Sequence, residues 1–416
     1  MADRSVLESP AIGTSASDLI RPCSQPEAGP ATPPPPPRQP ALALAFSGGG
    51  FRATLSALGV LRFVADAGLL PQVRYVSSVS GGSVANGSLA CAYADLQKEG
   101  FTATSVDEVV ILPLIRTVST RSLTSHLLAN VWRVLGPGTR TNLLADSFDQ
   151  WFFHGRLLED LPTECRFIFN AASVTTGVRF GLERDVVGDY VMGRVSTAGT
   201  GLRVADAVAA SAAVPGAFPP LVLKGLRFPC AEGRTAALVD GGAYDNMGLE
   251  PVDDFYQQPR GPVRQGAEVC LVALNAGGVF HTGAYGGIPV VRDLQRANAL
   301  LYRQSTALRM RSMVERFQAW EQARAANTPP PRWARFGVLF GLATTMQPTQ
   351  EWASVRPEHP EWREQLVNVH TSLGKFPVEV CTRLVYRGWW LAGATLSRFH
   401  RQLLPEALPA WRELAP

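Results

Sequence analysis

The most constraining feature of this chain is a unit that occurs twice near its start: an apolar strand, a glycine turn and a helical pattern. The strand-like run Ala41–Phe46 leads into the Gly48–Gly50 turn and a helical pattern over Ala53–Ala67. The strand-like run Val73–Val79 leads through a second glycine turn into a helical pattern over Ser83–Leu96. Two such units in succession are typical of α/β proteins, and they predict a parallel or mixed sheet covered by helices.

Patterns farther along the chain extend the same sheet. Two predicted strands joined by a tight turn cover Cys165–Ser173 and Gly177–Glu183, and two buried strands are predicted over Ala236–Val239 and Val269–Asn275. Helices are predicted over Val204–Ala213, Val290–Trp320 and Val378–Phe399. The arginine-bearing side of the longest helix suits either solvent or an anionic lipid surface. The aromatic region 118–153 suits either a lid over a site or ordinary core.

The first 40 residues differ from the rest in composition. They are rich in Pro, Ser, Ala and Gly, and they end in a proline run from Pro33 to Pro37. Such a composition cannot bury a core. We therefore predict a disordered tail over residues 1–40 and a single domain over residues 41–416.

Charge and cysteine content restrict the class of function. A net charge of +4 gives no indication of nucleic-acid binding, whereas contact with an anionic lipid surface stays open. The six cysteines form no C-x-x-C pair, so neither a disulfide framework nor a zinc site is expected. The N-terminus shows no apolar signal segment, and no run of about 18 uncharged apolar residues occurs. We expect a cytoplasmic protein that uses no metal and no cofactor.

Ser80 is the candidate nucleophile, because it lies on the sharp turn between the second strand and its helix. A nucleophile elbow tolerates little side-chain bulk two residues on either side, where strand and helix backbones crowd together. Ser80 has Ser78 and Gly82 at these positions. Ser78 would instead have the bulky Val76 before it, and Ser83 lies a turn into the helix. Ser78 stands where the G-x-S-x-G motif has its first glycine.

The turn formed by Gly48, Gly49 and Gly50 is the candidate oxyanion hole, with Gly81 beside the nucleophile as a further donor. N–H groups between a strand and a helix N-terminus can point at one anion. A nucleotide-phosphate cradle uses the same physics, but no acidic residue ends the second strand and no P-loop motif is present. Arg52, just inside the turn, suits either binding a lipid phosphate or bracing the loop by an ion pair.

Asp240 is the candidate base, since it ends a strand-like run and precedes a Gly-Gly turn, where a carboxylate can face a cleft. An aspartate before Gly-Gly is often only a turn residue. Asp245, Asp206 and Asp253 are rivals that lack this combination. The six histidines lie in no recognisable motif, which favours a Ser–Asp dyad but leaves a spatial triad open.

Four blocks of the chain resemble the patatin-like phospholipases in their amino-acid sequence and in their order along the chain. Ser47–Ala53 is similar to the family's glycine-rich oxyanion block, Ser78–Ser83 to its nucleophile elbow in the cytosolic and fungal form, Ala209–Pro215 with Phe218–Pro220 to its alanine-serine block, and Asp240–Asn246 to the D-G-[GA] block of its bacterial members. Together the blocks extend the resemblance over most of residues 42–400.

The resemblance implies a three-layer α/β/α sandwich with a central, mostly parallel sheet. It also implies hydrolysis of lipid carboxylic esters, in which Ser80 and Asp240 act through an acyl-enzyme. The expected partners are a phospholipid or lysophospholipid substrate and a membrane surface contacted peripherally, with no nucleic acid. Two alternatives remain: a lipid-binding or scaffolding protein that keeps the fold without catalysis, and an esterase acting on soluble substrates.

Overall fold

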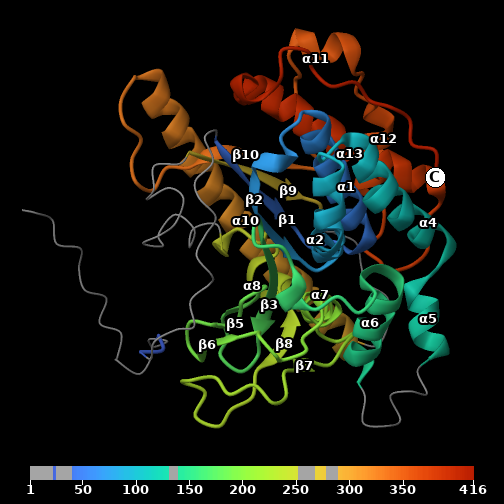
Figure 1. The fold of residues 1–416 in the computed structure, drawn as a ribbon, viewed down its shortest axis with the longest axis vertical. Coiled ribbons are helices and arrows are strands. Elements are labelled where there is room, and N and C mark those ends of the chain that lie inside the picture. The colour runs from blue at the N-terminus through green and yellow to red at the C-terminus, as the bar shows by residue number, and fades with distance from the viewer. Residues whose placement is uncertain (1–21, 25–39, 131–138, 252–267, 278–288) are drawn as a thin grey trace, which may run out of the picture.

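The computed structural model describes residues 22–24, 40–130, 139–251, 268–277 and 289–416, which form a sheet with helices on both faces (Figure 1). Within these residues the sheet has ten strands, and its main path runs in the order β10-β9-β1-β2-β3-β4-β5-β6. The path is parallel from β10 to β3 and antiparallel from β3 to β6. The predicted three-layer α/β/α fold with a mostly parallel sheet is confirmed.

The longer strands coincide with the apolar runs of the sequence. The strands are β1 (Ala41–Phe46), β2 (Val73–Val79), β3 (Arg166–Ser173), β4 (Arg179–Leu182), β5 (Val186–Asp189), β6 (Gly193–Ser196), β7 (Leu221–Val222), β8 (Ala237–Asp240), β9 (Val269–Asn275) and β10 (Phe336–Gly341). β8 leaves the main path and pairs with β3 and β7.

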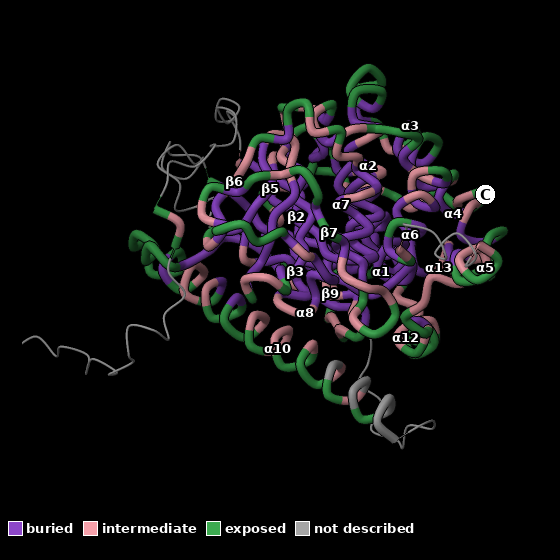
Figure 2. The backbone as a smooth tube through the Cα atoms, turned by 90° about the horizontal axis from the view of Figure 1, so that it is seen from below, coloured by how far each residue is buried: buried purple, intermediate pink, exposed green. Residues whose placement is uncertain are grey.

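The helices form the two outer layers. They are α1 (Gly50–Asp66), α2 (Gly81–Lys98), α3 (Ala103–Val106), α4 (Leu112–Thr120), α5 (Leu123–Ala129), α6 (Arg140–Phe148), α7 (Val204–Ser211), α8 (Gly242–Asp245), α10 (Pro289–Ala325), α11 (Gln350–Val355), α12 (Pro360–Val367) and α13 (Val378–Phe399). Figure 2 shows α10 along one side of the sheet with an exposed outer surface, and α1, α2, α7 and α13 on the other side.

Alternation along β1 divides the core between the two layers. Residues at even positions, from Leu42 to Phe46, join the large core beneath α1, α2 and α13. The alanines at odd positions join a smaller core with Met313 and Phe317 of α10. Both faces of the strand are buried, as expected for a central parallel strand covered by helices on each side.

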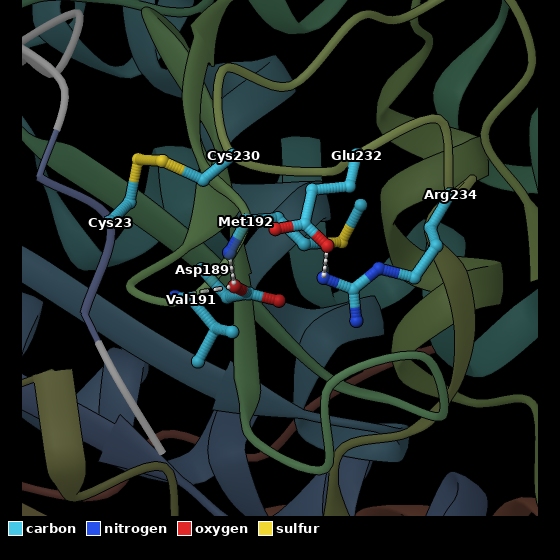
Figure 3. Close-up of a disulfide and its surroundings, with 7 residues drawn as sticks. All are labelled: Cys23, Asp189, Val191, Met192, Cys230, Glu232 and Arg234. Carbon is cyan, nitrogen blue, oxygen red and sulfur yellow. Dashed lines mark hydrogen bonds and ion pairs between the residues drawn. A yellow bond between two sulfur atoms is a disulfide. The ribbon is translucent and has the colours of Figure 1, made fainter.

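A disulfide joins the predicted tail to the domain, which the scattered cysteines did not lead us to expect. Cys23 is bonded to Cys230, with 5.7 Å between the Cα atoms (Figure 3). The N–H of Cys23 donates to Tyr190 O at 2.8 Å, and the N–H of Cys230 donates to Met192 O at 2.9 Å. Both cysteines are thus seated on the turn between β5 and β6. The expectation of no disulfide framework did not include this single bond, because the sequence does not show that Cys23 and Cys230 meet in the folded chain.

Two sequence-based predictions fall partly outside the described residues. Residues 1–21 and 25–39 lie outside them, so the disorder of the tail and the boundary at residue 40 stay predictions. Residues 131–138 of the aromatic region also lie outside them. Between residues 139 and 153, Leu144 and Phe148 are fully buried and Trp151 nearly so, and these side chains belong to the core, whereas Leu128 is 69% exposed. The choice between a lid and ordinary core for the whole region stays open.

Candidate active site

Ser80 and Asp240 come together because two strands end on the same edge of β3. β2 runs parallel to β3, and its last residue, Val79, lies opposite Asn170. β8 runs antiparallel to β3, and its last residue, Asp240, lies opposite Ala171. Since β4 occupies the other edge of β3 over the same positions, β2 and β8 must share one edge and end head to head. Ser80, which follows β2 directly, therefore faces Asp240.

The turn at Ser80 has the crowding expected of a nucleophile elbow. Ser80 adopts a φ of 51° and a ψ of −119°, an unfavourable backbone conformation for a residue with a side chain. A Cβ on Gly81 would lie 1.9 Å from Gly50 O, and one on Gly82 would lie 2.6 Å from Phe46 O. Only glycine permits this approach of α2 to the first glycine turn, so the elbow and the turn are built as one unit.

The carboxyl of Asp240 is buried, with 1% of the residue exposed. One carboxyl oxygen accepts a hydrogen bond from the N–H of Gly242 at 2.7 Å, and the Ser80 hydroxyl lies close enough to the carboxyl to lower its pKa. Burial raises the pKa of Asp240 to about 6, and the contacts with Gly242 and Ser80 partly offset this effect. A carboxylate with this pKa can accept a proton near neutral pH.

Three of the four predicted oxyanion donors are available. The N–H of Gly48 already donates to Asn246 O at 3.0 Å, so the fold itself uses this donor. The N–H groups of Gly49, Gly50 and Gly81 have no acceptor among the described residues. Gly50 and Gly81 are the first residues of α1 and α2, so the positive ends of two helix dipoles meet at the site.

Arg52 is buried and hydrogen-bonded to the segment after β9 and to the segment between α12 and α13. Its Nε and Nη2 donate to Ala276 O at 3.2 and 3.0 Å, Nη1 donates to Val369 O at 2.5 Å, and Nη2 also donates to Thr371 Oγ1 at 3.0 Å. Desolvation lowers the pKa of Arg52 to about 10. The guanidinium thus braces the glycine turn through carbonyl and hydroxyl oxygens rather than through an ion pair. Its expected role in substrate binding stays a prediction.

Histidine is absent from the described hydrogen-bond partners of the Asp240 carboxyl. His400 is buried with its Nε2 3.0 Å from Gly337 O, and His126 packs against an aromatic ring. His359 stacks on another aromatic ring, and His281 lies outside the described residues. Among the described contacts of the Asp240 carboxyl, the Ser80 hydroxyl and the Gly242 N–H are present and an imidazole is not.

The rival aspartates have structural partners. Asp245 accepts three backbone N–H groups and lies 3.3 Å from the guanidinium of Arg309, which ties α10 to the loop after β8. Asp206 pairs with Arg203 at the start of α7, with 2.8 Å between side-chain atoms. Asp253 lies outside the described residues. The described partners of Asp245 and Asp206 do not include the Ser80 hydroxyl.

Two polar residues near the site were not singled out as functional by the sequence patterns. Asn170, within β3, donates from its amide to Ser77 Oγ and to Ser78 O, each at 2.9 Å. Ser78 is fully buried, lies 3.0 Å from Ser83 Oγ and accepts from the amide of Asn86 at 2.8 Å. The serine that replaces the first motif glycine is therefore part of a hydrogen-bonded cluster. An asparagine inside an otherwise apolar strand was the available signal for Asn170.

Two further features of the described residues bear on the class of protein. Within them, we find no helix whose length and hydropathy would suit a transmembrane segment. The same residues contain no cluster of three or more His, Cys, Asp or Glu side chains arranged to hold a metal ion.

Residues 44–253, half of the chain, match the family model described as patatin-like phospholipase, and the match includes both Ser80 and Asp240. The chain belongs to the patatin-like phospholipase family. No match is found among curated proteins.

One solved structure extends the likeness in fold beyond the matched region. Human GIVD cytosolic phospholipase A2 is similar with a TM-score of 0.51 and 13% identity, over 88% of this chain and 60% of that protein. The chain therefore spans less than two thirds of that relative. VipD from Legionella pneumophila is matched with a TM-score of 0.32 and 14% identity, over 84% of this chain and 67% of VipD.

Proposed function

We propose that the protein is a lipid acyl hydrolase, of phospholipase A or lysophospholipase type, in which Ser80 is the nucleophile and Asp240 the base. The proximity of the Ser80 hydroxyl to the buried Asp240 carboxyl supports this proposal most strongly. Family membership supports a lipid ester as the substrate.

The proposed reaction has two steps. Ser80 Oγ forms a bond to the ester carbonyl carbon while its proton passes to Asp240, and the oxyanion accepts from the N–H groups of Gly49, Gly50 and Gly81. Collapse of this intermediate breaks the ester C–O bond, and the leaving alcohol takes the proton from Asp240. Water then attacks the acyl-enzyme carbonyl and gives its proton to Asp240. Collapse of the second intermediate breaks the bond between the acyl carbon and Ser80 Oγ, which takes the proton back from Asp240, and the fatty acid leaves.

We further propose that the enzyme contacts a membrane surface peripherally to reach its substrate.

The sequence-based expectation of a cytoplasmic location has a consequence for the disulfide. Disulfides persist in oxidising compartments and are reduced in the cytosol, so a cytoplasmic form would lack the bond between Cys23 and Cys230.

A fluorophosphonate probe followed by peptide mass spectrometry tests the proposed nucleophile. Label on the peptide that contains Ser80, and its loss in Ser80→Ala, is the expected result. Release of fatty acid from mixed phospholipid micelles then tests the substrate class. A labelled protein that hydrolyses only monomeric esters would indicate an esterase for soluble substrates. A folded protein without label or hydrolysis would indicate a non-catalytic lipid-binding protein.

A further inference from the structure

A serine from the alanine-serine block lies directly beneath the candidate nucleophile. Ser211 is the last residue of α7 and is fully buried. Its Oγ is 2.9 Å from the backbone N–H of Ser80, 2.6 Å from Asn170 O and 2.9 Å from Ser83 Oγ. One hydroxyl thus touches the backbone of the nucleophile, β3 and the first turn of α2.

Proton counting fixes the direction of each of these bonds. A serine hydroxyl has one proton to donate and two lone pairs to accept with. Because a carbonyl oxygen can only accept, the proton of Ser211 goes to Asn170 O. The Oγ of Ser211 then accepts from the Ser80 N–H and from the Ser83 hydroxyl. The Ser211 hydroxyl uses its one proton and both lone pairs. Removal of this hydroxyl would therefore leave the buried Ser80 N–H without its acceptor.

The main chain of the same segment holds the other half of the site. Ser211 O accepts from the N–H of Gly241 at 3.2 Å, and Ala213 O accepts from the N–H of Asp240 at 2.9 Å. The end of α7 therefore binds the nucleophile through a side chain and the candidate base through two carbonyls. This arrangement gives the alanine-serine block a physical reason to accompany the other three blocks.

We infer that Ser211 is a positioning residue for the hydrolysis proposed above, on which this inference rests. Its hydroxyl holds the Ser80 backbone in the orientation that points Oγ at both the carboxyl of Asp240 and the ester. Ser80 needs such support because its φ of 51° is unfavourable, and unfavourable conformations persist only where the surroundings fix them. Ser211 acts through Ser80 and not on the substrate.

Ser211→Ala tests the inference, since it removes the acceptor and keeps both main-chain carbonyls. We expect kcat per active site, counted by fluorophosphonate labelling, to fall roughly 10- to 100-fold, as for an unsatisfied buried donor. KM for a monomeric ester should change little, because Ser211 does not contact the substrate. The pH at which kcat/KM declines should stay at the wild-type value, because the hydrogen bonds to Asp240 and Gly241 remain.

Ser83→Ala is the matched control. It removes a hydroxyl from the same buried cluster but leaves the bond from the Ser80 N–H to Ser211 in place. We expect it to keep most of the wild-type kcat. An equal loss of kcat in the two variants would assign the effect to general packing and would overturn the inference.

Ser211→Cys keeps the inference testable if the alanine variant does not fold. The thiol fills the same place with a weak acceptor, so the same loss of kcat is expected. Wild-type kcat in either folded variant overturns the inference, and loss of folding in both assigns Ser211 to stability alone, which also overturns it. An inactive wild-type protein overturns the proposed function as well, whereas an active wild type with an unaffected Ser211→Ala overturns only the role of Ser211.

Discussion

The Ser80 hydroxyl and the Asp240 carboxyl lie next to each other because β2 and β8 end head to head on one edge of β3. Strands rather than a long loop therefore set the approach of the two side chains. A site held in this way should tolerate the loss of either functional group without loss of the fold, so the effects of mutations on activity and on stability can be separated.

Ser80→Ala and Asp240→Asn should each lower kcat by about 10⁴-fold or more, as expected when a nucleophile loses its hydroxyl or its base. The double variant should be no less active than either single variant, because the two residues act as a unit. Steady-state kinetics on a short-chain ester, with the fold checked by circular dichroism, gives the comparison. Substantial turnover by Asp240→Asn would remove Asp240 from the role of base.

Replacing each histidine by alanine should cost little activity beyond any effect on packing. The Asp240 carboxyl has the Gly242 N–H and the Ser80 hydroxyl as its described partners, so no described histidine stands between base and nucleophile. The set must include His281, which lies outside the described residues. A folded histidine variant as inactive as Ser80→Ala would indicate a triad.

The raised pKa of Asp240 predicts opposite responses of activity and stability to pH. Because the base must be ionised, kcat/KM should fall as the pH drops below about 6. The folded protein favours the neutral form of the Asp240 carboxyl, because burial raises its pKa above the ordinary value of 3.8. The stability from this group is therefore full below about 3.8 and lost as the pH rises through about 6.

Asp240→Asn isolates that electrostatic effect, since an asparagine stays neutral at every pH. Its Tm should exceed that of the wild type at pH 8, and the difference should shrink at acidic pH, where Asp240 is protonated. Differential scanning fluorimetry across the pH range makes the measurement. A variant that melts at or below the wild-type temperature at pH 8 would show that burial does not penalise the Asp240 charge.

Local patterns predicted the elements that carry their own signals. β1, β2 and β9 have the predicted bounds, because each is a largely apolar or β-branched run that ends at a turn, and α13 has its predicted bounds as well. α1 begins at Gly50 rather than Ala53, because the glycine turn itself provides the first helical residues. Ser80 and Asp240 are likewise candidates from local signals, since each follows or ends a strand beside glycines, and their catalytic roles stay predictions.

Contacts between distant segments could not be predicted in this way. The bond from Gly48 N–H to Asn246 O, which removes one predicted oxyanion donor, depends on how the loop after β8 packs on the first glycine turn. The bond between Ser211 and Ser80 depends on where α7 ends against β3. Neither hydrogen bond produces a pattern that can be recognised in a single sequence, because each joins only two residues that lie far apart along the chain.

Gly50→Val should abolish activity and also lower the Tm markedly. The sequence alone predicts a modest loss of stability, but a Cβ at this position would lie 2.6 Å from Ser372 O, and Gly50 has a φ of +60°. A β-branched residue at such a φ costs about 1–3 kcal/mol in strain before any displacement of the neighbouring loop. Thermal melts and activity assays on the same variant test this prediction. An inactive variant with the wild-type Tm would instead support the modest loss of stability predicted from the sequence.

Arg52→Lys separates bracing of the loops from binding of a substrate phosphate. Lysine keeps the positive charge, but it lacks the planar guanidinium that donates to the oxygens of Ala276, Val369 and Thr371 at the same time. We expect a lower Tm and a similar fractional loss of turnover on a phospholipid and on an uncharged ester. A rise in KM confined to the phospholipid would instead support the substrate-binding role predicted from the sequence.

Cys23→Ser should lower the free energy of unfolding by about 2–4 kcal/mol, because the disulfide to Cys230 restricts the unfolded chain across a sequence separation of 207 residues. Cys91→Ser, which replaces a free cysteine, is the matched control and should leave this contribution intact. Denaturant unfolding with and without reductant measures the difference.

Deletion of residues 1–38 gives the same test without a point mutation. The composition of the tail alone predicts no effect, whereas the disulfide predicts a loss of stability close to that of Cys23→Ser, because the deletion removes Cys23. Thiol titration of the denatured, unreduced protein should find the four free cysteines, Cys91, Cys165, Cys270 and Cys381, and six thiols should appear after reduction. Six thiols before reduction, with a Tm that reductant does not change, would show that Cys23 and Cys230 are not bonded in the protein.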